Sequence, residues 1–273
     1  MATFVYQDKT VFYECSSEDK SQVLLLLNGI MMSTKSWDPF IDTFKKHVTV
    51  LRVDFFDQGQ SEKMSENYTQ TIQVEMLKAL LDHLDIKKVY LSGISYGGSI
   101  ALQFAAKYQD MVAKLMLFNA TAKTSAWLKA IGDGWNAVAK SRDGEAYYHI
   151  AIPYIYSPHF YNKNIAWMEA RKEKLIPLFS NPDFLDAITR LTISAETHDV
   201  SDVLRDINVK TLVVASTYDF LTPPFEQAFL TENMPNARMV TFETCGHASM
   251  YEQPELFVST ILGFIQEDGK YTI

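Results

Sequence analysis

The fold is decided by one short stretch of sequence, Val89-Tyr90-Leu91-Ser92-Gly93-Ile94-Ser95-Tyr96-Gly97-Gly98-Ser99-Ile100. An apolar run typical of a strand meets three glycines around one serine, and an apolar pattern at helical spacing follows. Residues 93–97 fit the G-x-S-x-G pattern of a nucleophile elbow, in which a sharp turn between strand and helix holds the serine. Glycine suits this turn because it lacks the β-carbon that would resist the backbone angles and the close approach of neighbouring elements. Ser95 is therefore a candidate catalytic nucleophile.

The same pattern has a second interpretation, an ordinary strand-to-helix turn whose serine caps the helix. A chain of this length contains the pattern by chance about one time in ten. The rest of the sequence must therefore decide between the two.

Length and composition limit the classes of protein to which this chain can belong. Its 273 residues suffice for one large α/β domain or two small ones, and 47% hydrophobic residues supply a sizeable core. The formal net charge of −8 argues against a nucleic-acid partner, which would need a basic patch. Two cysteines do not make a disulfide framework.

The sequence gives no sign of export or of a membrane partner. The N-terminus lacks a basic start followed by an apolar stretch. The longest aliphatic run, residues 23–27, is far too short to span a bilayer. We therefore expect a cytoplasmic protein, and whether it is a monomer or a homodimer stays open.

Strands and helices alternate along most of the chain. Apolar runs predict strands, the first two forming a hairpin, at residues 4–6, 10–15, 23–27, 48–53, 88–91, 114–118, 209–215 and 238–242. Helical spacing predicts helices at residues 37–44, 68–84, 99–108, 225–232 and 254–266. This alternation is typical of a doubly wound α/β fold with a mainly parallel sheet of about eight strands.

The alternation stops between residues 122 and 199, where no strand is evident. Helical stretches that are rich in aromatic residues and broken by prolines and glycines occupy this range. We interpret residues 122–199 as a helical insertion that acts as a cap, or lid, over one edge of the sheet. The core domain is then predicted to comprise residues 1–121 and 200–273.

Candidate catalytic residues follow the predicted strands where those strands end. Ser95 lies in the elbow, Asp219 follows the seventh strand, and His247 follows the eighth. In open α/β sheets, active sites lie beyond the carboxyl ends of the strands. Serine, aspartate and histidine occur here in the chain order of one type of catalytic triad.

These residues resemble the α/β-hydrolase fold superfamily, and the resemblance covers nearly the whole chain. Five segments carry it, in the order that the family has: Leu26-Leu27-Asn28-Gly29 with Trp37, Asp54 with Gly59 and Ser61, the elbow at Ser95, the Asp219 loop running into Pro223, and Gly246-His247.

Two positions depart from the family pattern. Asn28 stands where the oxyanion loop usually has histidine, and an amide side chain can still hold that loop by hydrogen bonds. Phe56 and Asp57 stand where the turn after Asp54 usually has arginine and glycine.

The chemistry of a serine nucleophile gives each residue a role. Ser95 needs a base, and the imidazole of His247 can take its proton and later return it because histidine titrates near neutral pH. Asp219 would fix the tautomer of that imidazole and stabilise its protonated form. The developing oxyanion needs backbone N–H donors, which we assign to Ile30 and Tyr96.

Alternatives exist for some of these roles. Asp199 or Asp202 could replace Asp219, although both lie where the insertion ends and not at a strand end. Cys245 is expected to be a small buried residue. Histidines and cysteines lack zinc-type spacing, so we expect neither a metal nor a cofactor. The remaining histidines are expected on the surface or in packing: His47, His83, His149, His159 and His198.

Apolar residues beside the candidate site and aromatic residues of the helical insertion are expected to line a substrate pocket. The candidates are Asn28, Gly29, Met31, Phe220, Met250, Trp127 and Trp135. Apolar walls with few polar groups favour a small acyl substrate of modest polarity.

The sequence therefore predicts a cofactor-independent serine hydrolase that cleaves a small, largely apolar carboxylic ester through an acyl-enzyme. The same triad also serves thioesterases, lactonases, carbon–carbon bond hydrolases and acyltransferases. A ligand-binding signalling protein on this scaffold is the alternative from a different class.

Overall fold

A single twisted sheet runs through the middle of the protein, whose computed structural model describes residues 2–267. The predicted core range 200–273 therefore extends into residues 268–273, which lie outside the described part. Within residues 2–267 the sheet has eight strands in the order β1-β2-β4-β3-β5-β6-β7-β8. The strands are β1 (Ala2–Tyr6), β2 (Lys9–Cys15), β3 (Val23–Leu27), β4 (Thr49–Val53), β5 (Val89–Ile94), β6 (Val112–Phe118), β7 (Thr211–Ser216) and β8 (Ala237–Phe242).

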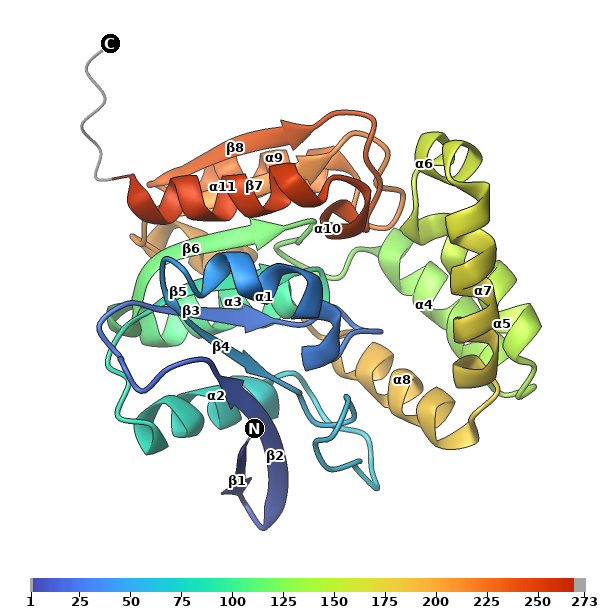
Figure 1. Cartoon of the computed structure of the whole chain (residues 1–273), viewed down its shortest axis with the longest axis horizontal. Helices are drawn as coiled ribbons and strands as arrows, with labels where there is room; N and C mark the ends of the chain where they lie inside the picture. The colour runs from blue at the N-terminus through green and yellow to red at the C-terminus, as the bar shows by residue number, and fades with distance from the viewer. Residues whose placement is uncertain (1, 268–273) are drawn as a thin grey trace.

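The pairing of these strands confirms the predicted mainly parallel sheet. β1 and β2 form an antiparallel hairpin, and β2 pairs antiparallel with β4. All the other neighbouring strands pair in parallel. Because parallel strands point the same way, their carboxyl ends collect at one end of the molecule (Figure 1).

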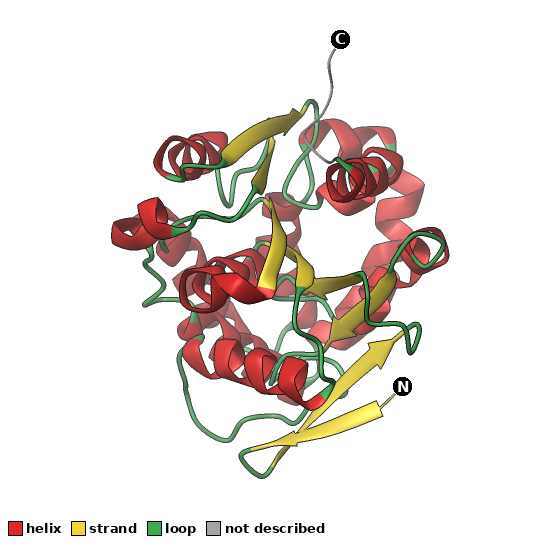
Figure 2. Ribbon diagram, turned by 90° about the vertical axis from the view of Figure 1, so that its left-hand side faces the viewer, coloured by secondary structure: helices red, strands yellow, loops and turns green. Residues whose placement is uncertain are grey.

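Helices cover both faces of the sheet, as the red helices on either side of the yellow strands show (Figure 2). Every residue of β3 is buried, because alternate side chains point to opposite faces and each face is covered. Leu24 and Leu26 belong to one hydrophobic cluster with residues of α1 and α11, whereas Leu25 and Leu27 belong to another with residues of α2, α3 and α9. These helices are α1 (Asp38–Phe44), α2 (Thr71–His83), α3 (Tyr96–Tyr108), α9 (Pro224–Asn233) and α11 (Pro254–Gln266).

The elbow differs from the sequence prediction at both of its ends. The strand before it continues to Ile94, because Gly93 and Ile94 still pair with β3 and β6. The helix after it begins at Tyr96 and not at residue 99, since the turn is confined to Ser95. The glycines permit a shorter turn than the sequence pattern indicated.

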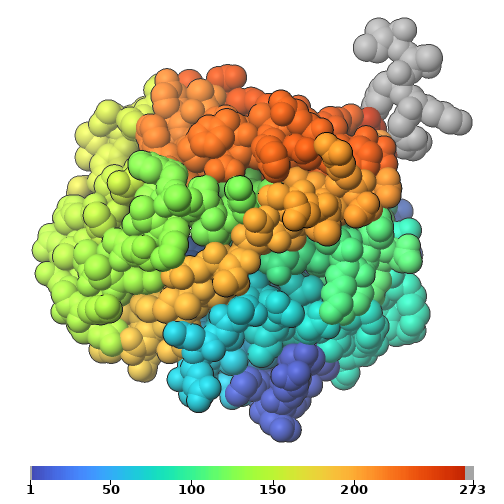
Figure 3. Space-filling model, turned by 180° about the vertical axis from the view of Figure 1, so that it is seen from behind, coloured from blue at the N-terminus to red at the C-terminus, as the bar shows by residue number. Residues whose placement is uncertain are grey.

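Between β6 and β7 the chain forms the helical insertion, which packs against the carboxyl ends of the strands (Figure 1). An isolated antiparallel bridge between Lys123 and Asp199 joins its two ends. Seen from behind, its green and yellow surface adjoins the core, and the orange segment that returns to β7 crosses the junction (Figure 3). Its helices are α4 (Ala126–Ala139), α5 (Gly144–Ile155), α6 (Pro158–Lys163), α7 (Ile165–Phe179) and α8 (Pro182–Ser194).

A buried ion pair ties this insertion to the core. Arg190 of α8 donates to the carboxylate of Asp57, with Nη2 2.6 Å from Oδ1 and Nε 3.1 Å from Oδ2. The Asp57 side chain is fully buried, and its oxygen also accepts from the backbone N–H of Met64. Phe56 is fully buried in the core. The departure from the family pattern at residues 56 and 57 thus serves packing between core and insertion.

We expect Gly97→Ala to lower the free energy of unfolding by at least about 2 kcal/mol. A β-carbon on Gly97 would overlap the carbonyl of Leu27 and lie 2.7 Å from the oxygen of Asn28, so backbone would have to move. Gly263→Ala is the control, because nothing lies within 4 Å of its added β-carbon in α11. That variant should gain about 0.5–1 kcal/mol. Urea unfolding measures both, and an unchanged midpoint for Gly97→Ala would contradict the crowding argument.

We expect Arg190→Met to cost about 3 kcal/mol of stability, because it leaves the Asp57 carboxylate buried without its counter-charge. The double variant Asp57→Leu/Arg190→Met should recover part of that loss. Lys87→Met, which removes a pair that is more than four-fifths exposed on both sides, should leave the urea midpoint unchanged. Equal midpoints for Arg190→Met and Lys87→Met would show that the buried pair does not stabilise the junction.

Candidate active site

Ser95 occupies the turn between β5 and α3 in a strained backbone conformation. Its φ is 53° and its ψ is −118°, a region that side chains disfavour and that marks functional sites more often than ordinary turns. The conformation is held by hydrogen bonds on both sides. Its N–H donates to the carbonyl of Phe118 at 2.9 Å, and its own carbonyl accepts from Gly98 and Ser99. Ser95 lines a cavity of the protein.

His247 and Asp219 form a close buried pair. Nδ1 of His247 lies 2.7 Å from Oδ2 of Asp219, and both side chains are more than nine-tenths buried. The structure thus brings Asp219 to His247. The carboxylate of Asp199 instead accepts from the backbone N–H of Ser201. With Nδ1–H donating to Asp219, Nε2 is the imidazole nitrogen left to act as a base, and His247 lines the same cavity as Ser95.

The Asp219 carboxylate is surrounded by donors. Oδ1 accepts from the backbone N–H groups of Leu221 and Thr222, each at 2.9 Å. Oδ2 accepts from the Thr222 hydroxyl and from Nδ2 of Asn119, each at 2.8 Å. These bonds hold the carboxylate in place opposite the imidazole.

Asn119 is a site residue that the sequence analysis did not identify. It follows β6 with a φ of 51°, and its side chain donates to Asp219 and to the hydroxyl of Ser216. Its Oδ1 accepts from Ser249, two residues after His247. The sequence signal for this residue is a polar side chain directly after a strand that lies between the strands leading to Ser95 and Asp219.

The loop after β3 is held by the side chain of Asn28. Its Oδ1 accepts from the indole N–H of Trp37 at 2.6 Å, and its Nδ2 donates to the carbonyl of Val53 at 2.9 Å. Gln58 accepts a second hydrogen bond from Nδ2 and donates to the carbonyl of Gly29. An amide, with both a donor and an acceptor, thus satisfies all three buried neighbours.

Ile30 and Tyr96 present free backbone donors to the cavity. Both residues line it, and within residues 2–267 neither backbone N–H donates to a protein acceptor. A pair of unpaired N–H groups, one of them next to the nucleophile, is what an oxyanion requires.

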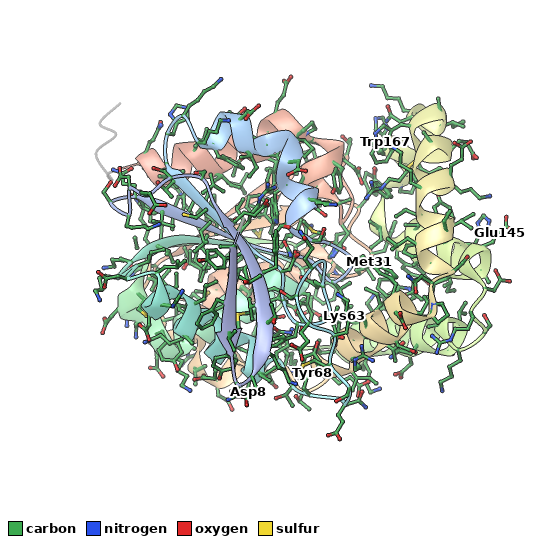
Figure 4. The ribbon with its side chains drawn as sticks, turned by 60° about the horizontal axis from the view of Figure 1, so that its bottom comes forward. Asp8, Met31, Lys63, Tyr68, Glu145 and Trp167 are labelled. Atoms are coloured by element: carbon green, nitrogen blue, oxygen red, sulfur yellow. The ribbon has the colours of Figure 1, made fainter. Side chains whose placement is uncertain are left out.

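The cavity lies between the carboxyl ends of the strands and the helical insertion, and most of its lining is apolar. Gly29, Met31, Met250 and Trp135 line it, and their role as substrate contacts stays a prediction. In Figure 4, Met31 lies on the side of the core that faces the insertion, whereas Glu145 lies on the insertion's outer side.

Three residues expected in the pocket lie outside its lining: Asn28, Trp127 and Phe220. Asn28 is fully buried behind the loop that it supports. Trp127 and Phe220 are about half exposed, and the Trp127 indole N–H donates to the Phe220 carbonyl on the outer surface. We therefore leave all three out of the proposed pocket.

His198 lines the cavity, although the sequence analysis assigned it to the surface or to packing. It is 5% exposed, with Nε2 3.0 Å from the carbonyl of Thr121 and Nδ1 3.1 Å from the amide of Gln103. Burial lowers the pKa of the imidazole, and both ring nitrogens are occupied. His198 is thus a neutral part of the wall and not a second base.

Other reactive groups are not arranged for catalysis or metal binding. Cys245 is fully buried, and burial raises the pKa of its thiol to about 12, so it stays protonated. Within residues 2–267 no three His, Cys, Asp or Glu side chains are grouped to hold a metal ion. In the same range no helix has the length and apolar character needed to cross a membrane.

Comparison with known proteins identifies the family of this chain. The family described as "alpha/beta hydrolase fold" matches residues 22–254. The chain is 56% identical in sequence to MGS-M2, an alpha/beta hydrolase enzyme from a Medee basin deep-sea metagenome library. The crystal structure of MGS-M2 matches this chain with a TM-score of 0.97, and the match covers 100% of both chains. The chain therefore belongs to the α/β hydrolase fold family, as the sequence resemblance predicted, and it is an enzyme of that family.

Two more distant relatives carry names that describe an activity. "Putative carbamate hydrolase RutD" of Caulobacter sp. (strain K31) is 26% identical over 249 residues, which are 91% of this chain and 92% of that protein. "3-oxoadipate enol-lactonase 1" of Acinetobacter baylyi is 23% identical over 269 residues, which are 95% of this chain and 94% of that protein.

We expect His198 to make stability fall on acidification. Its pKa is lower in the folded than in the unfolded protein, so the unfolded state binds the proton more readily and stability is lost as the pH falls below 6.5. Between about pH 7.5 and 5.5 the unfolding free energy of His198→Gln should fall less than that of the wild type. His47→Gln, at an exposed histidine, is the control. Its unfolding free energy should fall by as much as that of the wild type. Urea unfolding at each pH measures these free energies. An equal fall with pH in all three proteins would contradict the prediction.

Proposed function

We propose that the protein is a serine hydrolase that cleaves a small, largely apolar carboxylic ester through an acyl-enzyme. One observation carries the proposal. His247, which contacts Asp219 at 2.7 Å, lines the same mostly apolar cavity as the strained Ser95. A structural ion pair would need neither a strained serine nor a cavity beside it.

The first half of the reaction would form the acyl-enzyme. Nε2 of His247 takes the hydroxyl proton as the oxygen of Ser95 attacks the ester carbonyl carbon. The carbonyl oxygen becomes an oxyanion, which the N–H groups of Ile30 and Tyr96 stabilise. The carbon–oxygen bond to the leaving group then breaks, and the imidazolium returns its proton to the departing alkoxide. Asp219 stabilises the imidazolium between these steps.

The second half would release the acid. Water attacks the acyl carbon while His247 accepts its proton, and a second oxyanion collapses. The bond to Ser95 breaks, and its oxygen recovers the proton from His247. The products are a carboxylic acid and an alcohol, with no external oxidant, metal or cofactor in the balance.

The helical insertion would act as a cap over this site. Its helices supply Trp135 and other apolar residues to the cavity wall opposite the elbow. The division into a core of residues 1–121 and 200–273 and a cap of residues 122–199 stays a prediction, as do the cytoplasmic location and the choice between monomer and homodimer.

Lactone hydrolysis is the second candidate, because a lactone is a cyclic ester and one relative bears the name of an enol-lactonase over 95% of this chain. Thioesters, carbamates and β-diketones complete the panel of substrates to test. If every class fails and Ser95→Ala still binds a ligand tightly, the signalling-protein alternative would replace the hydrolase.

We expect Ser95→Ala and His247→Ala each to remove nearly all turnover of p-nitrophenyl butyrate, and Asp219→Asn to reduce it by up to about 10⁴-fold. A fluorophosphonate probe should label the wild type but not Ser95→Ala. Ser259→Ala and Asp202→Asn are the matched controls and should keep wild-type rates. Labelling of Ser95→Ala, or full activity of Asp219→Asn, would contradict these assignments.

A further inference from the structure

Two buried donors in the cavity wall have no acceptor. Several buried side-chain nitrogen and oxygen atoms in residues 2–267 lack a hydrogen-bond partner, and two of these atoms belong to residues that line the cavity. They are Nε of Arg171 and Nε1 of Trp135, and both are N–H donors. A buried donor without an acceptor is costly, and both donors belong to residues of the wall, of which Arg171 also carries a charge.

Arg171 lies on the face of α7 that forms the wall. Arg171, Leu175 and Phe179 line the cavity at a spacing of four residues, which places them on one side of the helix. The guanidinium lies against two aromatic rings, with its Cζ 4.8 Å from the centre of Tyr251 and 5.3 Å from that of Trp167. Figure 4 shows Trp167 on α7 of the insertion. The rings fix the guanidinium without neutralising its charge.

The charge of Arg171 is not balanced by a protein carboxylate. Within residues 2–267 no Asp or Glu oxygen lies within 4 Å of its guanidinium. The other cationic side chain of the lining, Lys129, is paired with Asp133 at 2.8 Å and with Glu196 at 3.6 Å. Tyr156 also lies close, since the Arg171 charge opposes the rise that burial causes in the pKa of that hydroxyl. The wall therefore has one fixed positive charge without a carboxylate partner among residues 2–267.

We propose that Arg171 binds an ionised carboxyl group of the substrate, so that the ester carries a carboxylate at some distance from the bond that is cleaved. This inference rests on the proposed function and names its substrate class. A guanidinium matches a carboxylate through two parallel hydrogen bonds. A single unpaired cation in a mostly apolar wall fits a monoanion better than a phosphate, which carries up to two charges.

Matched pairs of esters test the proposal. For a carboxylate in the acyl part, monomethyl esters of the dicarboxylic acids from succinic to suberic are compared with their dimethyl esters. For a carboxylate in the alcohol part, 3-carboxyphenyl butyrate is compared with phenyl butyrate. The wild type should favour the carboxylated member of at least one pair by tenfold or more in kcat/KM. A preference for the neutral member throughout would overturn the proposal.

Variants on α7 attribute the preference to one side chain. Arg171→Gln should raise KM for the preferred carboxylated ester by about 10–100-fold while kcat/KM for its neutral partner changes less than about threefold. Arg171→Lys keeps the charge but not the planar guanidinium with its paired donors, so its KM should lie between those of the wild type and Arg171→Gln. Lys172→Gln removes a charge from the next position, which does not line the cavity, and should behave as the wild type. A preference that survives Arg171→Gln would overturn the assignment.

A binding measurement separates this proposal from the proposed function. Calorimetry with Ser95→Ala and the same monomethyl and dimethyl esters needs no turnover. Binding of a monomethyl ester that Arg171→Gln abolishes in the double variant supports the anion site even if no ester is hydrolysed. Normal ester turnover by the wild type, with equal affinity of Ser95→Ala for the charged and neutral esters, would overturn the anion site and leave the hydrolase assignment intact.

Discussion

The close contact between the elbow and the strands on either side of it is the constraint on which the site depends. A β-carbon on Gly93 would overlap the backbone of Gly97, and one on Gly97 would overlap the end of β3. Because no side chain separates these segments, backbone contact alone sets their spacing. This spacing positions the Ser95 hydroxyl and the two free N–H groups at Ile30 and Tyr96 without any contribution from side-chain contacts.

Two carboxylates, the buried Asp57 and the half-buried Glu252, connect the core to the helical insertion. Asp57 binds Arg190 of α8, and Glu252 accepts from the N–H and hydroxyl of Ser157, at 2.8 and 2.6 Å, and from the N–H of Gly246 at 3.1 Å. Burial raises the pKa of Glu252, and the hydrogen bonds from Ser157 and Gly246 oppose that rise. Since Gly246 precedes His247, the contact that anchors the insertion also fixes the loop of the proposed base.

Features with a local cause could be predicted from the sequence, and features created by tertiary contact could not. The elbow at Ser95 and the buried strand β3 follow from glycine spacing and a continuous apolar run, so they were found. Asn119 was missed because its function is to bind Asp219, one hundred residues later, and an asparagine at a strand end does not reveal that partner. Trp127 was placed in the pocket because aromatic composition cannot tell the inner face of a helix from the outer one.

The charges of the cavity lining favour a ligand that carries a carboxylate. The lining contains one carboxylate side chain, Glu196, and it is paired with Lys129, whereas Arg171 has no carboxylate within 4 Å among residues 2–267. Asp219 is not part of the lining and already accepts four hydrogen bonds in addition to its contact with His247. The wall offers a ligand the backbone N–H groups of Ile30 and Tyr96 and, elsewhere, the guanidinium of Arg171. A neutral apolar ester would use the first pair during the reaction and leave the guanidinium without an anion. An ester with a distant carboxylate can use both, which is the physical reason to expect selectivity from a mostly apolar cavity.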